Sequence, residues 1–182
     1  TLEYMDIDFR EMVQQTEGEM AEKFAARNLS VVLNLPEEAA VIHLDGRRMW
    51  RVLENIFGNA AKYAMPGTRV YVDAIRKDGK IQFSIKNISE NALNCEADEL
   101  TERFIRGDVS RSTEGSGLGL SIAKNLTVLQ QGTFDIYLDG DLFKVTITFD
   151  EVVKEKKPET SGYTAKPEMP EEDLEKPSSD TI

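Results

Sequence analysis

Three polar side chains interrupt an apolar helical pattern at spacings of four and then three residues: Asn55, Asn59 and Lys62. Because a helix turns by about 100° per residue, these spacings place all three on one flank beside an apolar arc. An amide oxygen is a neutral, hard ligand for Mg²⁺, and a lysine neutralises phosphate oxygens. The group suits a metal-nucleotide, although an ordinary exposed helix face explains it too, at a cost of roughly a few tenths of a kcal/mol per asparagine.

A second candidate phosphate site is a glycine-rich segment that leads directly into a predicted helix. The segment reads Gly115, Ser116, Gly117, Leu118, Gly119 and Leu120. Glycines also serve as simple chain breakers, but backbone N–H groups at a helix N-terminus bind phosphate when no Cβ blocks the approach. The segment has no Lys-Ser or Lys-Thr of a P-loop, and it follows a polar loop rather than the strand of a dinucleotide-binding motif.

A polar loop between these two segments carries Phe104, Arg106 and Arg111. The phenylalanine is a candidate anchor for a lid, and the two arginines are candidates for binding phosphate oxygens. An ordinary charged surface loop is the alternative for each arginine, because unpaired exposed charges are common. The polar, glycine-punctuated composition of residues 103–114 predicts a lid that is mobile without nucleotide.

Composition limits the classes of function. The chain has 182 residues, of which 40% are hydrophobic, and a formal net charge of −11, which suits one globular domain with a tail. This acidic balance argues against a nucleic-acid partner.

The single cysteine, Cys95, excludes an internal disulfide framework and a cysteine zinc cluster, and it indicates a reducing compartment. No apolar run approaches the ~18 residues of a membrane span, no signal peptide is expected, and a start at Thr1 rather than Met indicates a piece of a longer chain.

Hydrophobic periodicity predicts alternating helices and strands along the body of the chain. Asp8 and Asp45 each precede a helical pattern as capping residues. The predicted helices cover 8–28, the segment after Asp45 that carries the polar stripe, and 118–130; the predicted strands cover 29–35, 41–44, 69–76, 80–86, 133–138 and 142–149.

Two turn signals indicate how these strands pair. Asp78-Gly79 and Gly140-Asp141 lie between strand-like runs and predict two hairpins. We therefore expect a two-layer α/β (α+β) sandwich, with a mixed, mostly antiparallel sheet and the helices on one face. From Glu151 to Ile182 the chain is rich in Pro, Ser, Glu and Lys, which predicts a disordered tail, with a docking tail as the alternative.

The order of the motifs resembles one known family. Asn-x-x-x-Asn-Ala-x-Lys-Tyr, then Phe-x-Arg-Gly-Asp, then Gly-Ser-Gly-Leu-Gly-Leu is similar to the catalytic ATP-binding domain of bacterial sensor histidine kinases, in the ATPase superfamily shared with gyrase and heat-shock-90 proteins. The resemblance covers about Asp8 to Phe149. It implies a Bergerat-type sandwich that holds ATP and Mg²⁺ between the asparagine-rich helix and a lid.

The resemblance also implies roles for single residues. Asn59 is the expected Mg²⁺ ligand, Asn55 and Lys62 are expected to contact phosphates, and Tyr63 is expected to lie beside the nucleotide. The residues expected to shape the phosphate-facing turn are Gly115, Gly117 and Gly119. In the hydrolases of the superfamily a water-activating Glu stands where this chain has Asn55, and an amide is a very poor general base, so the sequence favours phosphate transfer over hydrolysis.

The chain departs from the family after its second hairpin strand. The family pattern is Asp-x-Gly-x-Gly, in which the Asp accepts a hydrogen bond from the adenine amino group; here Asn87 takes the Asp position and both glycines are absent. An amide oxygen still accepts that hydrogen bond. Exchanging a charged acceptor for a neutral one costs about 1 kcal/mol, so we expect roughly fivefold weaker ATP binding.

The resemblance finally implies what lies outside this chain. The only histidine, His43, lacks the family's acceptor pattern, so the phosphoacceptor histidine is expected on a helical dimerisation domain upstream. We expect 1–7 to be the frayed end of that connection, 8–150 the ATP-binding catalytic domain and 151–182 the tail. The expected partners are ATP or ADP and a response regulator. The full-length protein is expected to be a homodimer anchored in the bacterial inner membrane, with this part in the cytoplasm and monomeric on its own.

Two other functions stay open at this stage. A degenerate nucleotide-binding module that works as a scaffold is favoured by the altered segment at Asn87. A serine kinase of the anti-sigma type, on the same fold, is a narrower alternative. The retained polar stripe favours an active kinase domain, because asparagines are intrinsically poor helix formers and would erode after loss of function.

Overall fold

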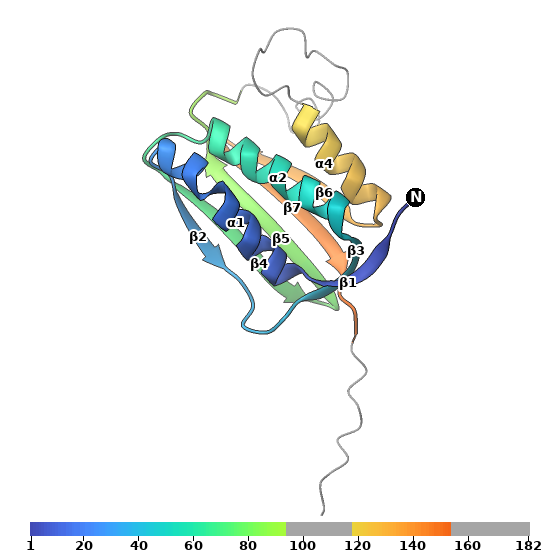
Figure 1. The fold of residues 1–182 in the computed structure, drawn as a ribbon. Coiled ribbons are helices and arrows are strands. Elements are labelled where there is room, and N and C mark those ends of the chain that lie inside the picture. The colour runs from blue at the N-terminus through green and yellow to red at the C-terminus, as the bar shows by residue number, and fades with distance from the viewer. Residues whose placement is uncertain (94–117, 154–182) are drawn as a thin grey trace, which may run out of the picture.

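The computed structural model describes residues 1–93 and 118–153. In this part of the chain three helices cover one face of a five-stranded sheet (Figure 1). The helices are α1 (Phe9–Ala26), α2 (Gly46–Tyr63) and α4 (Leu118–Leu129). Across the sheet the strands lie in the order β2 (Ser30–Asn34), β4 (Arg69–Lys77), β5 (Lys80–Ile88), β7 (Leu142–Asp150) and β6 (Thr133–Asp139). The predicted two-layer sandwich with helices on one face is confirmed.

The sheet is mixed, as expected. β4, β5, β7 and β6 pair antiparallel, whereas β2 runs parallel to β4 at the edge. The two predicted hairpin turns are present. Asp78 and Gly79 both have positive φ angles, of 54° and 75°, as a two-residue turn between twisted strands requires, and Gly140 has a φ of 59°.

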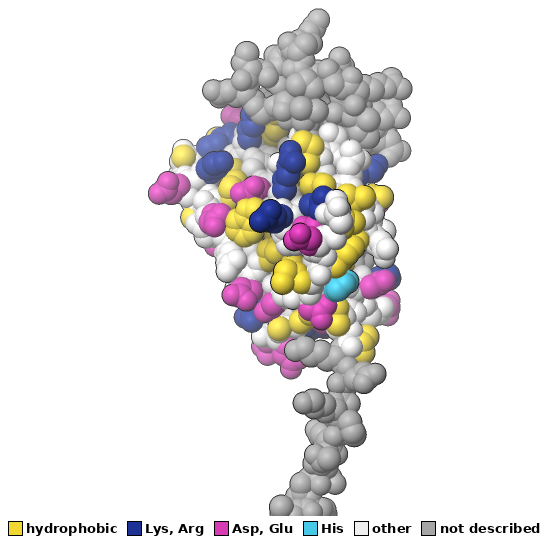
Figure 2. Space-filling view, turned by 45° about the vertical axis from the view of Figure 1, so that its right-hand side comes forward, with side chains coloured by type: hydrophobic (Ala, Val, Ile, Leu, Met, Phe, Trp, Pro, Cys, Tyr) yellow, Lys and Arg dark blue, Asp and Glu magenta, His cyan; other side chains and the backbone are white. Residues whose placement is uncertain are grey.

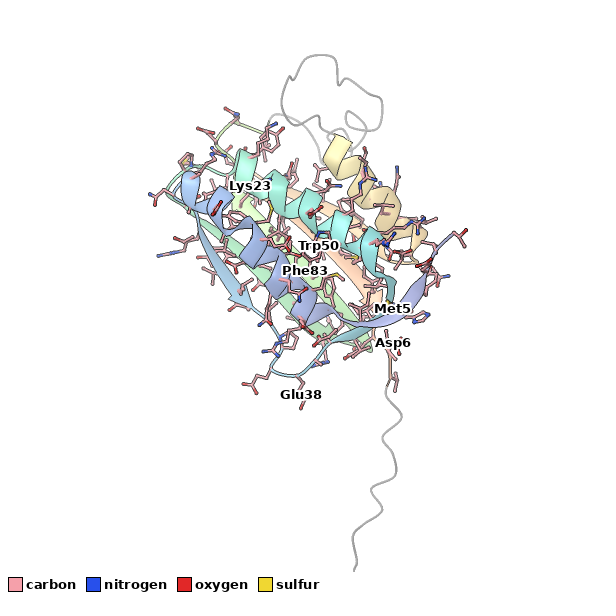
Figure 3. All side chains as sticks on the ribbon, viewed as in Figure 1. Met5, Asp6, Lys23, Glu38, Trp50 and Phe83 are labelled. Carbon is pink, nitrogen blue, oxygen red and sulfur yellow. The ribbon has the colours of Figure 1, made fainter. Side chains whose placement is uncertain are left out.

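One segment corrects the sequence analysis. The sequence predicts that residues 1–7 are the frayed end of a connection, but Tyr4–Asp8 forms strand β1 and pairs antiparallel with β3 (Val41–Asp45) in a separate two-stranded sheet. The segment is therefore ordered rather than frayed, and its role as a connection stays a prediction. Figure 3 shows Met5 and Asp6 on this strand, beside the end of the main sheet. The short segment has no strong strand pattern of its own, and its order comes from the hydrogen bonds to β3.

The core lies between the helices and the inner face of the sheet. Phe83 of β5 lies at its centre, with Phe9 at 5.5 Å and Phe57 at 6.2 Å between ring centroids (Figure 3). Because side chains alternate along a strand, the inward positions of β5 continue past Phe83 to Asn87 and then to Ser89 beyond its end. These two polar side chains are only 3% and 5% exposed. The strand therefore carries an amide and a hydroxyl into a mostly apolar layer.

Asp45 connects three parts of the fold. It caps α2, and its carboxylate accepts hydrogen bonds from the backbone N–H of Glu3 at 2.9 Å and from the N–H and guanidinium of Arg48 at 3.2 Å and 2.5 Å. Its own backbone N–H donates to the side-chain oxygen of Gln130, just beyond α4, at 2.9 Å. The pKa of Asp45 is lowered from 3.8 to about 2, chiefly by the hydrogen bond from Glu3, against the opposing effect of burial and with further lowering from Arg48.

We expect Asp45→Ala to lower the free energy of unfolding by about 2 kcal/mol, because it removes a helix cap and the carboxylate partner of the Arg48 guanidinium. Since the pKa of Asp45 is lower in the folded chain than in the unfolded chain, its charge stabilises the fold above about pH 4, and this contribution is lost as the pH falls toward 2. Urea unfolding between pH 4 and pH 2 should show a shallower pH dependence for Asp45→Asn, which keeps the cap but not the charge. An unchanged pH slope would contradict this role.

Candidate functional site

A cavity of about 210 Å³ opens between the end of α2, the end of β5 and the start of α4. It is lined by Asn59, Tyr63, Asn87, Ser89, Asn91, Leu93, Leu120 and Phe143. The two aliphatic residues and the two aromatic residues supply apolar walls, while the amides and the hydroxyl supply a few hydrogen-bonding groups. Such a mixture is typical of small-molecule sites. The volume is below the roughly 300 to 1,000 Å³ that encloses a drug-sized ligand, so it suits one planar ring system rather than a whole nucleotide.

Backbone hydrogen bonds hold the two main walls of the cavity together. The N–H of Met65 donates to the carbonyl oxygen of Ile88 at 2.8 Å, and the N–H of Glu90 donates to that of Tyr63 at 2.9 Å. Arg27 strengthens this junction. Its guanidinium donates to the carbonyl oxygen of Ala61 at 2.9 Å and pairs with the Glu90 carboxylate at 2.6 Å. The end of α2 and the end of β5 are thus fixed side by side, which brings residues 59 and 63 to residues 87 and 89.

The polar stripe of α2 lies on the flank that faces α4. A Cβ placed on Gly119 would lie 3.9 Å from side-chain atoms of Asn55, so the two helices meet at this pair. The side-chain nitrogen of Asn55 is buried and has no hydrogen-bond partner among the described residues. Leaving a buried N–H₂ group without an acceptor costs roughly 1–3 kcal/mol, and a bound ligand is one source of that acceptor.

The structure brings together four of the predicted site residues in one cavity: Asn59, Tyr63, Asn87 and Leu120. Asn55 and Gly119 lie against each other nearby. Lys62 is exposed on the same helix, with its Nζ 5.3 Å from the centroid of the Tyr63 ring. The ligand contacts predicted for these residues remain predictions.

Several predicted residues lie outside the described ranges. They are Phe104, Arg106, Arg111, Gly115, Ser116 and Gly117, together with the predicted lid and the tail from residue 154 onward. For Leu118 the structure describes the helical backbone only.

The cavity also contains residues that the sequence analysis did not name as site residues: Ser89, Asn91, Leu93 and Phe143. The alternation of β5 provided a signal for Ser89, since it shares the inward face with Asn87. Phe143 had no such signal. It reaches the cavity because β7 pairs with β5 in the register that places Phe143 opposite Asn87.

His43 lies elsewhere. Its ring nitrogen is 2.9 Å from the Asp6 carboxylate and its ring stacks on Tyr4 at 5.2 Å, both on β1. Figure 2 shows the histidine at the surface beside acidic side chains. His43 therefore packs in the two-stranded sheet of β1 and β3, and it is not one of the described residues that line the cavity.

The donor set of the cavity suits a hard cation shared with a phosphorylated ligand. No group of three or more His, Cys, Asp or Glu that could hold a metal occurs in the described residues. Mg²⁺ keeps several waters and is commonly bound through a few protein oxygens plus substrate phosphates. The amide oxygen of Asn59 fits that requirement.

In the part of the chain that the structure describes, no helix is long and apolar enough to cross a membrane.

Comparisons with known proteins agree with this geometry. Residues 44–175 match the family described as "Histidine kinase-, DNA gyrase B-, and HSP90-like ATPase". The sensor histidine kinase WalK of Bacillus subtilis is 30% identical over 135 residues, which cover 71% of this chain and 22% of WalK. The histidine-protein kinase BaeS of Escherichia coli is 27% identical over 128 residues, which cover 69% of this chain and 27% of BaeS. The chain thus spans about a quarter of the length of these curated relatives.

Solved structures show the same fold. The catalytic domain of the histidine kinase ThkA has a TM-score of 0.71 at 18% identity, covering 82% of this chain and 97% of that domain. The mycobacterial sensor histidine kinase MprB has a TM-score of 0.69 at 21% identity, covering 84% of this chain and all of the MprB chain. At these identities the likeness establishes the fold.

Proposed function

Because the chain belongs to the histidine kinase-, DNA gyrase B- and HSP90-like ATPase family, we propose that it is the ATP-binding catalytic domain of a two-component sensor histidine kinase. In this proposal the domain binds ATP with Mg²⁺ and transfers the γ-phosphate to a histidine on a separate, upstream dimerisation domain. A response regulator then receives the phosphate. The observation that carries the proposal is the cavity in which the family's polar helix, through Asn59 and Tyr63, meets the buried amide of Asn87.

The proposed site has two parts, one that binds the base and one that binds the phosphates. The mostly apolar cavity takes the base, whose flat faces pack against Tyr63, Leu120 and Phe143 while Asn87 contacts its polar edge. The phosphates extend along the polar flank of α2 toward α4. There Lys62 neutralises phosphate charge, and the buried N–H₂ group of Asn55 gains the hydrogen-bond acceptor that it lacks among the described residues.

A bound Mg²⁺, held by the Asn59 oxygen and by the phosphates, would neutralise charge that develops on the phosphate oxygens. The chain's own contribution is to position the γ-phosphate and to avoid activating water. Asn55 stands where a carboxylate base would be needed for hydrolysis, and its amide does not accept a proton near neutral pH. The γ-phosphate is therefore kept for the incoming imidazole nitrogen, which forms the new bond to phosphorus as the bond to the ADP oxygen breaks.

The acceptor lies outside the described residues in this proposal. His43 already pairs with Asp6 and stacks on Tyr4, in a two-stranded sheet away from the residues that line the cavity. We place the catalytic domain at about residues 8–150, with β1 extending it toward the N-terminus. We propose that the full-length protein is a membrane-anchored homodimer with this domain on the cytoplasmic side.

A second candidate is a nucleotide-binding module that acts only as a scaffold. The observation that favours it is the altered segment Asn87-Ile88-Ser89-Glu90-Asn91, which lacks the family's aspartate and glycines. Calorimetric titration of ATP and ADP, each with Mg²⁺, into this chain separates the two functions. Dissociation constants from micromolar to submillimolar support the kinase domain. If circular dichroism shows that the protein is folded and no heat of binding is measured at millimolar ATP, the scaffold function is favoured.

A further inference from the structure

We propose that the base cavity accepts purines with a 6-oxo group as well as purines with a 6-amino group, and that Asn87 determines this tolerance. Guanine nucleotides should therefore bind to this domain alongside adenine nucleotides. The inference rests on the proposed nucleotide site and names the substrate class that this site takes.

Asn87 is a buried amide in the wall of the cavity. Its side chain is 3% exposed, lines the cavity and shares the inward face of β5 with Ser89, which is 5% exposed. The other buried lining residues, Leu120 and Phe143, are apolar. Two further amides line the cavity: Asn59 of α2 is half-buried, and Asn91 is exposed at the rim. In the part of the chain that the structure describes, the buried polar edge of the cavity is thus one amide and one hydroxyl.

The amide of Asn87 is able to pair with either kind of purine edge. An amide presents a donor, N–H₂, and an acceptor, C=O, side by side. The edge of adenine offers the 6-amino donor next to the N1 acceptor, and the edge of guanine offers the 6-oxo acceptor next to the N1–H donor. A half-turn of the amide about its terminal bond therefore converts a match with adenine into a match with guanine. A serine hydroxyl either donates or accepts, so Ser89 does not oppose either base.

A carboxylate at the position of Asn87 would discriminate between the two kinds of purine, whereas the amide does not. An ionised carboxylate only accepts hydrogen bonds. At the position of Asn87 it would pair with a 6-amino group, but it would face the oxygen of a 6-oxo group placed in the same way. Selectivity often arises from such an unfavourable contact with the wrong ligand. Among the described residues that line the cavity there is no carboxylate, and so none of them makes the repulsive contact that would exclude guanine.

The test is calorimetric titration of this chain with ADP, GDP and inosine diphosphate, each with Mg²⁺. Inosine diphosphate has the 6-oxo group and N1–H but no 2-amino group, so it isolates the edge that Asn87 contacts. We expect its dissociation constant to lie within roughly tenfold of that of ADP, because each purine makes two hydrogen bonds to the amide. Binding of ADP with more than 100-fold weaker binding of both 6-oxo nucleotides would overturn the inference and leave the proposed function intact. If none of the three nucleotides binds, the proposed function itself is contradicted.

The variant Asn87→Asp tests the residue. We expect it to weaken inosine diphosphate and GDP at least tenfold, while ADP binding is retained or tightens by up to about fivefold. Asn91→Asp is the matched control, because it adds the same charge at the exposed rim and should affect all three nucleotides equally. Equal effects of Asn87→Asp on all three nucleotides would show that Asn87 does not select the base. If the buried carboxylate prevents folding, the titrations of the unmodified chain decide the matter alone.

Discussion

Asn59→Ala is expected to weaken binding of Mg²⁺-ATP by roughly 30- to 150-fold. Asn59 lines the cavity from α2, on the polar flank that leads from the base toward the proposed phosphate site. Losing a hydrogen bond or ligand to a charged partner costs about 2 to 3 kcal/mol, which corresponds to that loss of affinity. Isothermal titration of ATP into both proteins measures it directly.

A metal-free titration separates the role of Asn59 as a metal ligand from a direct contact to ATP. With EDTA the unmodified chain should lose most of its affinity, whereas Asn59→Ala should lose little more, because its metal ligand is already absent. Asn125→Ala is the matched control, since Asn125 is an exposed asparagine on the adjacent helix α4 and does not line the cavity. Equal binding by Asn59→Ala and the unmodified chain in Mg²⁺ would contradict the proposed metal site.

Gly132→Ala should destabilise the fold by about 2 to 3 kcal/mol. Gly132 lies in the tight turn between α4 and β6, where its N–H donates to the carbonyl oxygen of Thr127 at 3.0 Å. A Cβ at this position would lie 2.5 Å, 2.6 Å and 2.9 Å from ring atoms of Phe149. The Phe149 ring is 4% exposed and is part of the core, so neither it nor the turn can move without cost. Thermal unfolding should show a decrease in Tm of roughly 5 to 10 °C.

The control for this substitution is Gly119, in the first turn of α4. Gly119→Ala places its Cβ 3.9 Å from Asn55, an ordinary contact, and should not lower the Tm. Phe149→Leu should partly relieve the clash, so the effects of Gly132→Ala and Phe149→Leu should be less than additive in a double-mutant cycle. Strict additivity, or a Tm for Gly132→Ala equal to that of the unmodified chain, would show that the turn absorbs the methyl group.

The same turn explains why α4 is well placed to form a wall of the cavity. Gln130 follows the last residue of α4, and its side-chain oxygen accepts the N–H of Asp45 at the start of α2. The end of α4 is thereby tied to the N-terminal end of α2, while its first turn meets α2 at Asn55 and Gly119. We expect destabilisation at Gly132 to affect nucleotide affinity as well as stability, since both depend on how α4 lies against α2.

The sequence by itself determined most of the helices and strands and indicated candidate residues for the site. Asp8 and Asp45 indicated where two helices begin, and Asp78-Gly79 indicated a hairpin, because caps and turns depend on residues only a few positions apart. The helical period placed Asn55 and Asn59 on one flank for the same reason. The order of the motifs was sufficient to indicate the family to which the chain belongs.

Only the tertiary structure decided which distant segments meet. The parallel pairing of β2 with β4, the pairing of β1 with β3 and the position of Phe143 opposite Asn87 are contacts between residues far apart in the sequence. Such contacts depend on the free energy of the whole packed core, and no local pattern encodes them. For this reason the sequence identified Asn87 as unusual, whereas the fold showed that it is buried beside Ser89 as the polar edge of an apolar cavity.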